Sequence, residues 1–328
     1  MRVAILATGG TILGASNNRL DFIDYRAGVY TINQVLETIP EIKNIADITM
    51  EQLESLSSSE ITVSHWAIMK EKVEHYINDQ GYDGIVIVHG TNTIEETAYF
   101  LNLTVNSNKP IIIVGSQRPF TALGTDAEIN LINAIRLAVS PQAHNKGVLV
   151  VLNDEINAAR EVTKTNTYRL ETFQSGQLGF LGYVDVDHTV QFYRAPTRLH
   201  TANSCFSKIS LENLPDVAIL YSYAGASGDI IRMVTDCQRY KGIVMAGGGA
   251  GKVSQPEKEA LQRAVKKGIS VVRSSRVGNG RVVELSQYKD FAFIAGDNLT
   301  PQKARILLML ALKIENDPRK IEEMFKIY

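Results

Sequence analysis

The stretch Val3-Ala-Ile-Leu-Ala-Thr-Gly-Gly-Thr11 runs from five consecutive apolar residues into a glycine pair and a threonine. A short apolar run of this kind is typical of a strand buried on both faces of a parallel sheet. The paired glycines allow the backbone to turn sharply and other groups to approach closely. We therefore expect Thr11 just beyond the carboxyl end of a buried strand, where open α/β sheets bind their ligands.

A second stretch, Gly84-Ile-Val-Ile-Val-His-Gly-Thr-Asn-Thr93, repeats this arrangement and places Thr91 and Asn92 after another buried strand. Thr93 and Glu96 have the spacing of a capping box, which predicts that a helix starts there. Strand and helix patterns continue to alternate along the chain. This alternation predicts an α/β fold with a largely parallel sheet and helices on both faces.

The alternation pauses around residues 197–214, which we interpret as a linker. At 328 residues the chain is long enough for two domains. The sequence therefore predicts a larger N-terminal domain over residues 1–196 and a smaller C-terminal α/β domain over residues 215–328. The polar segment between Gly14 and Gly28 contains Tyr25 and has the composition of a mobile lid rather than of a core element.

The composition is that of an ordinary globular protein, with 45% hydrophobic and 21% charged residues and a formal net charge of -1. This charge gives no electrostatic reason to expect nucleic acid as a partner. The sequence also shows no secretory signal pattern and no apolar run of the roughly 18 residues that a membrane span needs. We expect a cytoplasmic protein that binds neither nucleic acid nor membrane.

The cysteines and histidines do not have the spacing of metal ligands, so we expect no metal ion. Cys205 and Cys237 are expected to be free thiols, with a single disulfide between them as the alternative. His89 follows a buried strand and is interpreted as a structural histidine. The run Gly247-Gly-Gly249 lacks the lysine and hydroxyl that end a phosphate-binding loop, and a lone glycine-rich turn is weak evidence for a nucleotide.

Five residues at expected strand ends or in adjoining loops could carry chemistry: Thr11, Tyr25, Ser58, Thr91 and Lys164. A threonine hydroxyl becomes a nucleophile only when a neighbour takes its proton, and tyrosine or lysine can do so. The amides of the Gly9-Gly10-Thr11 turn could stabilise an oxyanion. Taken singly, each of these hydroxyl groups could equally be a turn or cap residue.

Two of these stretches resemble the signature motifs of bacterial-type L-asparaginases and glutaminase-asparaginases. They are Ala7-Thr-Gly-Gly-Thr-Ile12 and His89-Gly-Thr-Asn-Thr-Ile-Glu-Glu-Thr-Ala-Tyr-Phe-Leu101. The resemblance extends to Arg160-Glu-Val-Thr-Lys-Thr-Asn166, Val272-Arg-Ser-Ser-Arg276 and Pro301-Gln-Lys-Ala-Arg305, and so spans the chain.

The resemblance implies a two-domain α/β amidohydrolase that uses no cofactor and converts L-asparagine, or L-glutamine, to the acid and ammonia. It implies a homotetramer, built as a dimer of intimate dimers, with active sites between domains of neighbouring subunits. Thr11 would be the nucleophile that forms an acyl-enzyme, and Tyr25 would be the lid residue that assists it. Thr91 and Lys164 would form a second pair that activates the nucleophile or water.

The resemblance also assigns substrate contacts, with Ser58 holding the α-carboxylate. The remaining contacts would be Gly10, Ser59, Gly90, Asn92 and Ser116. Several positions depart from the family pattern. Asn92 replaces an aspartate that would hold the substrate's α-ammonium and pair with the lysine, and Ser59 replaces a glutamine. Further departures are Ser116-Gln117 for Ala-Met, Ala250 and Lys252 for asparagines, and a neighbour-subunit glutamate for which Glu284 is only the nearest candidate.

Asn92 separates two hypotheses. In the first, the protein is an amidohydrolase with weakened recognition of the substrate amine, because a neutral amide replaces a charge-assisted contact. In the second, it is a weakened or inactive relative that serves as a ligand-binding protein or acts on an amide without a free α-amine. Loss of a counter-charge would also lower the pKa of Lys164.

Overall fold

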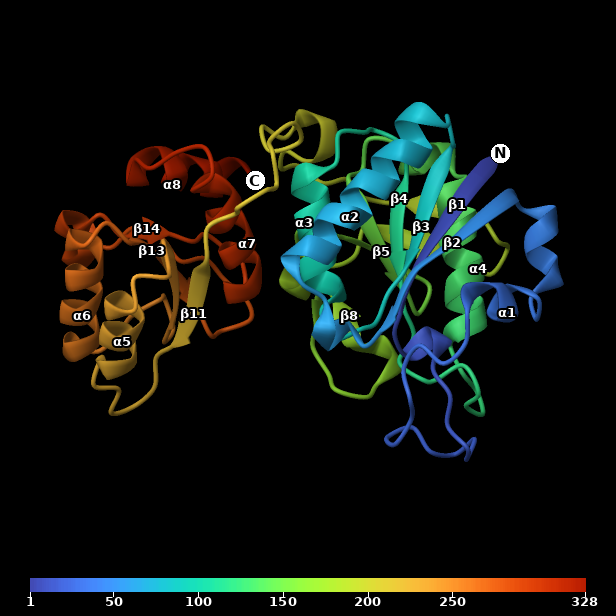
Figure 1. Ribbon diagram of the computed structural model, residues 1–328, viewed down its shortest axis with the longest axis horizontal. Coiled ribbons are helices and arrows are strands. Elements are labelled where there is room, and N and C mark those ends of the chain that lie inside the picture. Colours follow the sequence, from blue (N-terminus) through green and yellow to red (C-terminus); the bar gives the residue numbers. More distant parts are fainter. The chain divides into compact units, whose positions relative to one another are not determined.

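The computed structural model describes residues 1–328, which form two compact units, Met1–Ile209 and Ser210–Tyr328 (Figure 1). Each unit has a sheet covered by helices, and the larger sheet is mostly parallel. The α/β class predicted from the alternation of patterns is thus confirmed. The division between the units falls at residues 209 and 210.

The N-terminal unit is built on an eight-stranded sheet with the strand order β10-β9-β6-β5-β4-β3-β1-β2. The strands β2, β1, β3, β4 and β5 are parallel, and β6, β9 and β10 extend the sheet in antiparallel fashion. The bounds are β1 Arg2–Gly9, β2 Asp47–Leu56, β3 Gly84–Val88, β4 Ile111–Val114, β5 Val148–Leu152, β6 Glu155–Ala158, β9 Gly182–Val184 and β10 Val190–Phe192. A separate hairpin pairs β7, Thr163–Lys164, with β8, Phe173–Gln174.

Helices cover both faces of this sheet (Figure 1). They are α1 Ile32–Leu36, α2 Val63–Glu74, α3 Ile94–Thr104 and α4 Ala127–Ala138. Val3, Ile5 and Ala7 of β1 join the core beneath α1 and α4. The intervening residues Ala4 and Leu6 are also fully buried. Both faces of β1 are therefore apolar, as expected for a central parallel strand.

The short helical turns are Thr11–Leu13, Pro40–Asn44, Ser58–Glu60, a π-helical turn His75–Asp79, Pro141–Ala143, Leu170–Thr172, Gly176–Leu178, Thr201–Asn203 and Ser286–Phe291. The predicted start of α3 is confirmed, but the predicted capping box is not formed. Thr93 does precede the first residue of α3, but its side chain makes no capping bond. Its hydroxyl instead donates to the Ser58 carbonyl at 2.7 Å, so a contact with another loop replaces the local cap.

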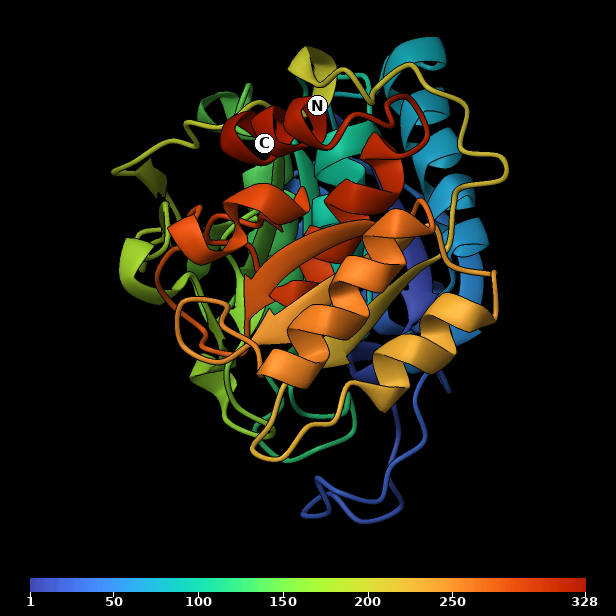
Figure 2. The ribbon, with the colours of Figure 1, turned by 90° about the vertical axis from the view of Figure 1, so that its left-hand side faces the viewer.

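The C-terminal unit has a four-stranded parallel sheet in the order β11-β12-β13-β14. Its elements are β11 Val217–Tyr221, α5 Asp229–Asp236, β12 Gly242–Gly247, α6 Gln255–Lys266, β13 Ser270–Ser275, β14 Ile294–Ala295, α7 Pro301–Ala311 and α8 Pro318–Ile327. Helices α5 and α6 lie in front of the sheet in Figure 2. Thr300 takes the expected position before α7, but its side chain forms no cap hydrogen bond. None of the helices of either unit has the length and apolar character to span a membrane.

Candidate active site

The carboxyl ends of β1 and β3 are in direct backbone contact through two glycines. A Cβ atom added to Gly10 would lie 2.3 Å from the Cα atom of Gly90, so only glycine fits there. Gly10 also has φ 87° and ψ -174°, a region of backbone conformation that glycine alone adopts freely. This contact brings Thr11 and Thr91, which follow the two glycines, to the same edge of the sheet.

Thr11 forms the first of two polar pairs at this edge. Its Oγ1 lies 2.7 Å from the hydroxyl oxygen of Tyr25, and Thr11 itself is 6% exposed. Tyr25 belongs to the segment predicted as a lid, which projects in dark blue from the lower edge of the N-terminal unit in Figure 1. Ala15 and Arg26 pair in antiparallel fashion across the base of this segment. The lid is thus closed over Thr11, and its tyrosine is within hydrogen-bond reach of that hydroxyl.

The lid is also tied to the loop after β4. The amide of Ser16 donates to Thr121 Oγ1 at 3.0 Å, and the amide of Leu123 donates to the Arg19 carbonyl at 2.8 Å. The guanidinium carbon of Arg118 lies 5.0 Å from the centre of the Phe22 ring, in range of a cation–π contact. These contacts fix the position from which Tyr25 reaches Thr11.

Thr91 and Lys164 form the second polar pair. Lys164 Nζ donates to Thr91 Oγ1 at 2.9 Å, although the two residues are 73 positions apart in the sequence. The Thr91 hydroxyl in turn donates to Oε1 of Gln117 at 3.3 Å. The Thr91 oxygen therefore keeps its lone pairs for the lysine. Burial lowers the pKa of Lys164, and the charge of Glu95 opposes that shift.

Ser58, Ser59 and Asn92 form the wall beside these pairs. The main-chain amide of Asn92 donates to Ser58 Oγ at 3.0 Å, and its side-chain Nδ2 donates to Ser59 Oγ at 2.9 Å. Ser58 is 3% exposed, and a Cβ atom on Gly90 would lie 2.8 Å from its hydroxyl oxygen. The structure thus gathers polar hydrogen-bonding groups but places a neutral amide, not a carboxylate, at position 92.

His89 lies at the end of β3, between the Gly90 carbonyl and the Thr97 side chain of α3. It is fully buried, with Nδ1 2.7 Å from the Gly90 carbonyl and Nε2 3.0 Å from Thr97 Oγ1. Burial lowers the pKa of His89 to about 4, so the ring is neutral at physiological pH. Trp66 Nε1 donates to the same Thr97 oxygen at 2.8 Å. The prediction of a structural histidine is confirmed.

Two features of the site differ from what the residue pattern indicates. The Gly10 amide donates to the Leu56 carbonyl at 2.9 Å, so it is not available to stabilise an oxyanion. Ser116 is fully buried, and its hydroxyl donates to the Arg118 carbonyl at 2.6 Å. The neighbouring Gln117, rather than Ser116, contacts Thr91.

Sequence reasoning did not select Gln117 or Glu95 as site residues. Gln117 follows β4 at the same edge of the sheet, which is a signal that could have found it. Glu95 accepts a hydrogen bond from the Lys164 amide at 3.1 Å. The pair Glu95-Glu96 offers no local clue to which carboxylate faces Lys164, so this contact depends on the tertiary structure.

The C-terminal residues noted in the sequence lie in their own unit. Glu284 lines a cavity of about 680 Å³ together with Arg273 and Tyr288. Ala250 and Lys252 belong to the tight turn after β12, where the backbone of Gly248 pairs with that of Lys252. Cys205 and Cys237 are both free and exposed, as expected. No group of three or more acidic, histidine or cysteine side chains is arranged to hold a metal ion.

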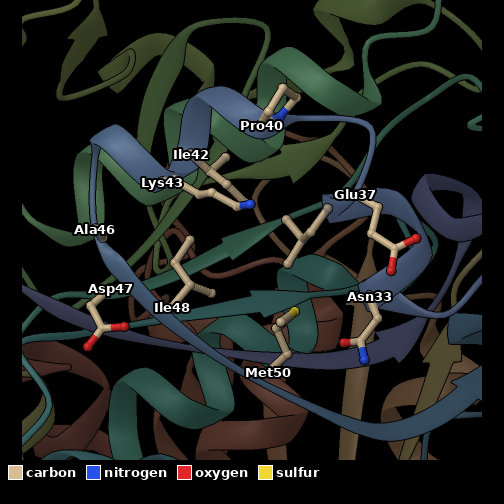
Figure 3. A pocket seen from close by; sticks show the side chains of 10 residues that line it. Asn33, Glu37, Pro40, Ile42, Lys43, Ala46, Asp47, Ile48 and Met50 are labelled. Atoms are coloured by element: carbon tan, nitrogen blue, oxygen red, sulfur yellow. The ribbon is translucent and has the colours of Figure 1, made fainter.

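An apolar hollow of the N-terminal unit is separate from this site. It has a volume of about 610 Å³ and lies between α1, the Pro40–Asn44 turn and β2 (Figure 3). Ile42, Ile48, Lys43 and Glu37 are among the side chains that line it (Figure 3). It contains none of the residues assigned to chemistry, so the hydroxyl and lysine pairs, not this hollow, define the candidate site.

Comparison with protein families matches both units of the chain. Residues 2–198 match the model described as "Asparaginase, N-terminal", and residues 216–325 match "Glutaminase/Asparaginase C-terminal domain". The solved structure of a "Probable Cytoplasmic L-asparaginase" from Campylobacter jejuni is 43% identical, with a TM-score of 0.96. The alignment covers 100% of this chain and 99% of that one.

Curated relatives are similar over almost the whole chain. The L-asparaginase 2 of Bacillus subtilis is 44% identical over 326 residues, which cover 99% of this chain and 86% of that protein. The L-asparaginase 2 of Escherichia coli is 39% identical, with coverage of 99% and 93%. The glutaminase-asparaginase of Pseudomonas fluorescens is 40% identical, with coverage of 99% and 90%. The two family matches and these full-length relatives show that the chain belongs to the asparaginase family.

Proposed function

We propose that this protein hydrolyses the side-chain amide of L-asparagine, or of L-glutamine, to the acid and ammonia through a threonine acyl-enzyme. The names of its full-length relatives support this substrate class. The observation that carries the mechanism is the presence of two polar pairs at one sheet edge. They are Thr11 with Tyr25 at 2.7 Å and Thr91 with Lys164 at 2.9 Å.

In the first half of the reaction, Thr11 Oγ1 attacks the carbon of the substrate amide. As the Tyr25 oxygen accepts the Thr11 hydrogen, it passes its own phenolic hydrogen to the amide nitrogen. The carbon–nitrogen bond then breaks and ammonia leaves. The acyl group remains as an ester on Thr11. The short distance between the two hydroxyl oxygens suits this proton relay, which needs neither residue to carry a charge.

In the second half, water attacks the ester carbon and Lys164, in its neutral form, accepts the water's hydrogen with Thr91 as its hydrogen-bond partner. The ester bond breaks, the proton taken up by Lys164 is passed on to Thr11 Oγ1, and the acid leaves, so that both residues return to their starting forms. The lowered pKa of Lys164 favours this role, because more of the amine is neutral at a given pH. Ser58 and the main chain at Gly10 and Gly90 would bound the space that the substrate occupies.

Asn92 sets the expected strength of substrate binding. A carboxylate at this position would form a charge-assisted hydrogen bond with an α-ammonium group, whereas an amide forms a neutral one. The difference is about 1–2 kcal/mol, which corresponds to roughly 5- to 30-fold in affinity. We therefore propose an active enzyme with a high KM for L-asparagine.

Ammonia release from L-asparagine and L-glutamine by the purified protein and by Asn92→Asp tests the proposal. The parent should release ammonia, and Asn92→Asp should lower KM by about tenfold with little change in kcat. Thr11→Ala must release none, which excludes a contaminating enzyme. Asn78→Asp, an exposed change of the same chemistry at another place in the fold, controls for the added charge.

Other outcomes would refute parts of this proposal. Activity in Asn92→Asp but not in the parent would show that the parent is a binding protein that has lost catalysis. If the parent cleaves only succinamate, which lacks the α-amine, then the substrate class is different. If Thr11→Ala retains the parent's rate, then Thr11 is not the nucleophile.

We also propose that the protein acts in the cytoplasm as a dimer of intimate dimers. The similar Campylobacter protein is described as a probable cytoplasmic L-asparaginase, which supports the location. Apolar side chains on β11, its following loop and α5 support association, with Tyr221 54%, Tyr223 58% and Met233 66% exposed in the single chain. Light scattering on the purified protein would give the number of subunits, and a monomer at assay concentration would refute the assembly.

A further inference from the structure

Lys164 is held at two points by residues of the β3–α3 segment. Its side-chain nitrogen donates to Thr91 Oγ1 at 2.9 Å, and its main-chain amide donates to Glu95 Oε2 at 3.1 Å. Thr91 precedes α3, and Glu95 lies in the first turn of that helix. A single segment therefore positions both the backbone and the amine of Lys164.

The side chain of Glu95 is buried, which is unusual for a carboxylate: the residue is only 6% exposed. Buried carboxylates need partners to offset the loss of hydration. The first turn of a helix stabilises negative charge through the helix dipole, and the Lys164 amide supplies a hydrogen bond. The fold thus keeps a buried negative charge next to the strand that carries Lys164.

The charge of Glu95 acts on Lys164 against the effect of burial. Burial lowers the pKa of Lys164, and Glu95 is the charged group that raises it. Glu96 on α3 and Glu161 before β7 exert no resolved effect on the pKa of Lys164. Arg169 and Glu171, which follow β7, pair with each other at 3.4 Å. Asn92 is neutral, and its side-chain amide donates to Ser59.

We propose that Glu95 is a positioning residue that holds the Lys164 backbone and supplies the counter-charge of the Lys164–Thr91 pair. This proposal rests on the role of that pair in the proposed function. Gln117 completes the arrangement, since it accepts the Thr91 hydrogen and leaves the Thr91 oxygen directed at Lys164. Glu95 itself does not touch the substrate in this scheme. It sets the geometry and the protonation of a residue that acts on the reacting water.

Glu95→Gln separates charge from position, because the side-chain amide retains an oxygen that can accept the Lys164 amide hydrogen. Removal of the negative charge should lower the pKa of Lys164 by about one unit or more. The limb of the kcat/KM profile that follows Lys164 should therefore move to lower pH by the same amount. The direction of this movement is the same whether the active form of the lysine is charged or neutral. Glu95→Ala should move the profile as well and, in addition, lower kcat by about tenfold, because the backbone support is lost.

The pKa of Lys164 can be measured without relying on activity, by competitive acetylation of the folded protein at a series of pH values. Mass spectrometry of the peptide that contains Lys164 gives the rate at each pH, and Lys326 in the same digest serves as an exposed reference. Glu96→Gln is the matched control, since it removes a carboxylate from the adjacent position of the same helical turn.

The expected result is a lowered Lys164 pKa in Glu95→Gln and Glu95→Ala, with the parent value in Glu96→Gln. An unchanged Lys164 pKa in Glu95→Gln, in protein whose thermal unfolding matches that of the parent, would overturn the proposal. The labelling result stands even if the parent releases no ammonia, so failure of this inference is distinguishable from failure of the proposed function. If Glu95→Gln fails to fold, then labelling of Glu95→Asp, which keeps the charge on a shorter side chain, must give a Lys164 pKa close to that of the parent, and a large fall there would also overturn the proposal.

Discussion

The contact between Gly10 and Gly90 predicts that a single methyl group at Gly10 will separate the two polar pairs of the site. In Gly10→Ala the new Cβ atom would lie 2.3 Å from the Gly90 Cα and 2.5 Å from the Gly90 nitrogen. Ordinary contact between carbon atoms is about 3.5 Å, so the two strand ends must move apart by about 1 Å. Both neighbours are main-chain atoms, and no flexible side chain can give way.

Two costs follow from this substitution. Alanine at φ 87° and ψ -174° adopts a strained backbone, at about 1–3 kcal/mol, and the overlap adds about 1–3 kcal/mol. A displacement of about 1 Å between catalytic groups can lower the rate about 100-fold. We therefore expect Gly10→Ala to lose about 2–6 kcal/mol of unfolding free energy and to lower kcat/KM about 100-fold.

Gly179→Ala is the matched control for this prediction. Gly179 has φ 73° and ψ 170°, so alanine there suffers similar backbone strain. Its Cβ atom would meet only the end of the Arg194 side chain, at 3.4 Å. Urea unfolding and ammonia release should show that Gly179→Ala loses stability without losing kcat/KM. If Gly10→Ala retained kcat/KM within about threefold of Gly179→Ala, the reasoning from the backbone contact would be refuted.

Two further predictions concern Tyr25 and His89. Tyr25→Phe removes the hydroxyl that lies 2.7 Å from Thr11 Oγ1 and should lower kcat about 100- to 10,000-fold with an unchanged melting temperature. The control Tyr193→Phe, at an exposed site, should leave kcat as in the parent. A kcat of Tyr25→Phe near that of the parent would exclude the proton relay. Burial lowers the pKa of His89 from 6.5 to about 4 in the folded protein, so the unfolded chain binds the proton more readily. The free energy of unfolding therefore falls as the pH drops from 6.5 to about 4, by up to about 1.4 kcal/mol per pH unit. Urea unfolding of His89→Gln at several pH values should show lower stability at pH 7 but a shallower loss towards pH 4, and parallel pH dependences for the two proteins would contradict the assignment.

The sequence predicted the central part of the fold because that part obeys local rules. The apolar run before Thr11 predicts a buried strand, and the glycine pair after it predicts that the strand ends there; β1 in fact runs from Arg2 to Gly9, and the turn begins at Gly10. The same reasoning located β3 and the start of α3. It did not predict the side-chain contacts of Thr93, because the choice between capping its own helix and bonding to Ser58 depends on a loop 35 residues earlier.

The candidate site divides in the same way. Thr11, Tyr25, Thr91 and Lys164 were selected from the sequence, partly from their residue types at strand ends and partly from the resemblance to a family. The structure shows which side chain forms a hydrogen bond with each of these four residues. Gln117 and Glu95 emerged only there, because a hydrogen bond between residues 69 positions apart, such as that from Lys164 to Glu95, leaves no trace in local spacing.

By itself, the sequence determined the buried strands, the glycine turns and the chemical groups that end them, since apolar periodicity and glycine conformation act over a few residues. It also determined that position 92 is a neutral amide. Only the tertiary structure decided which hydroxyl meets which partner, which carboxylate faces Lys164, and that the Gly10 amide is already bonded to Leu56. The physical reason is that these contacts join separate strands and loops, and their geometry is fixed by the packing of the whole sheet edge around Gly10 and Gly90.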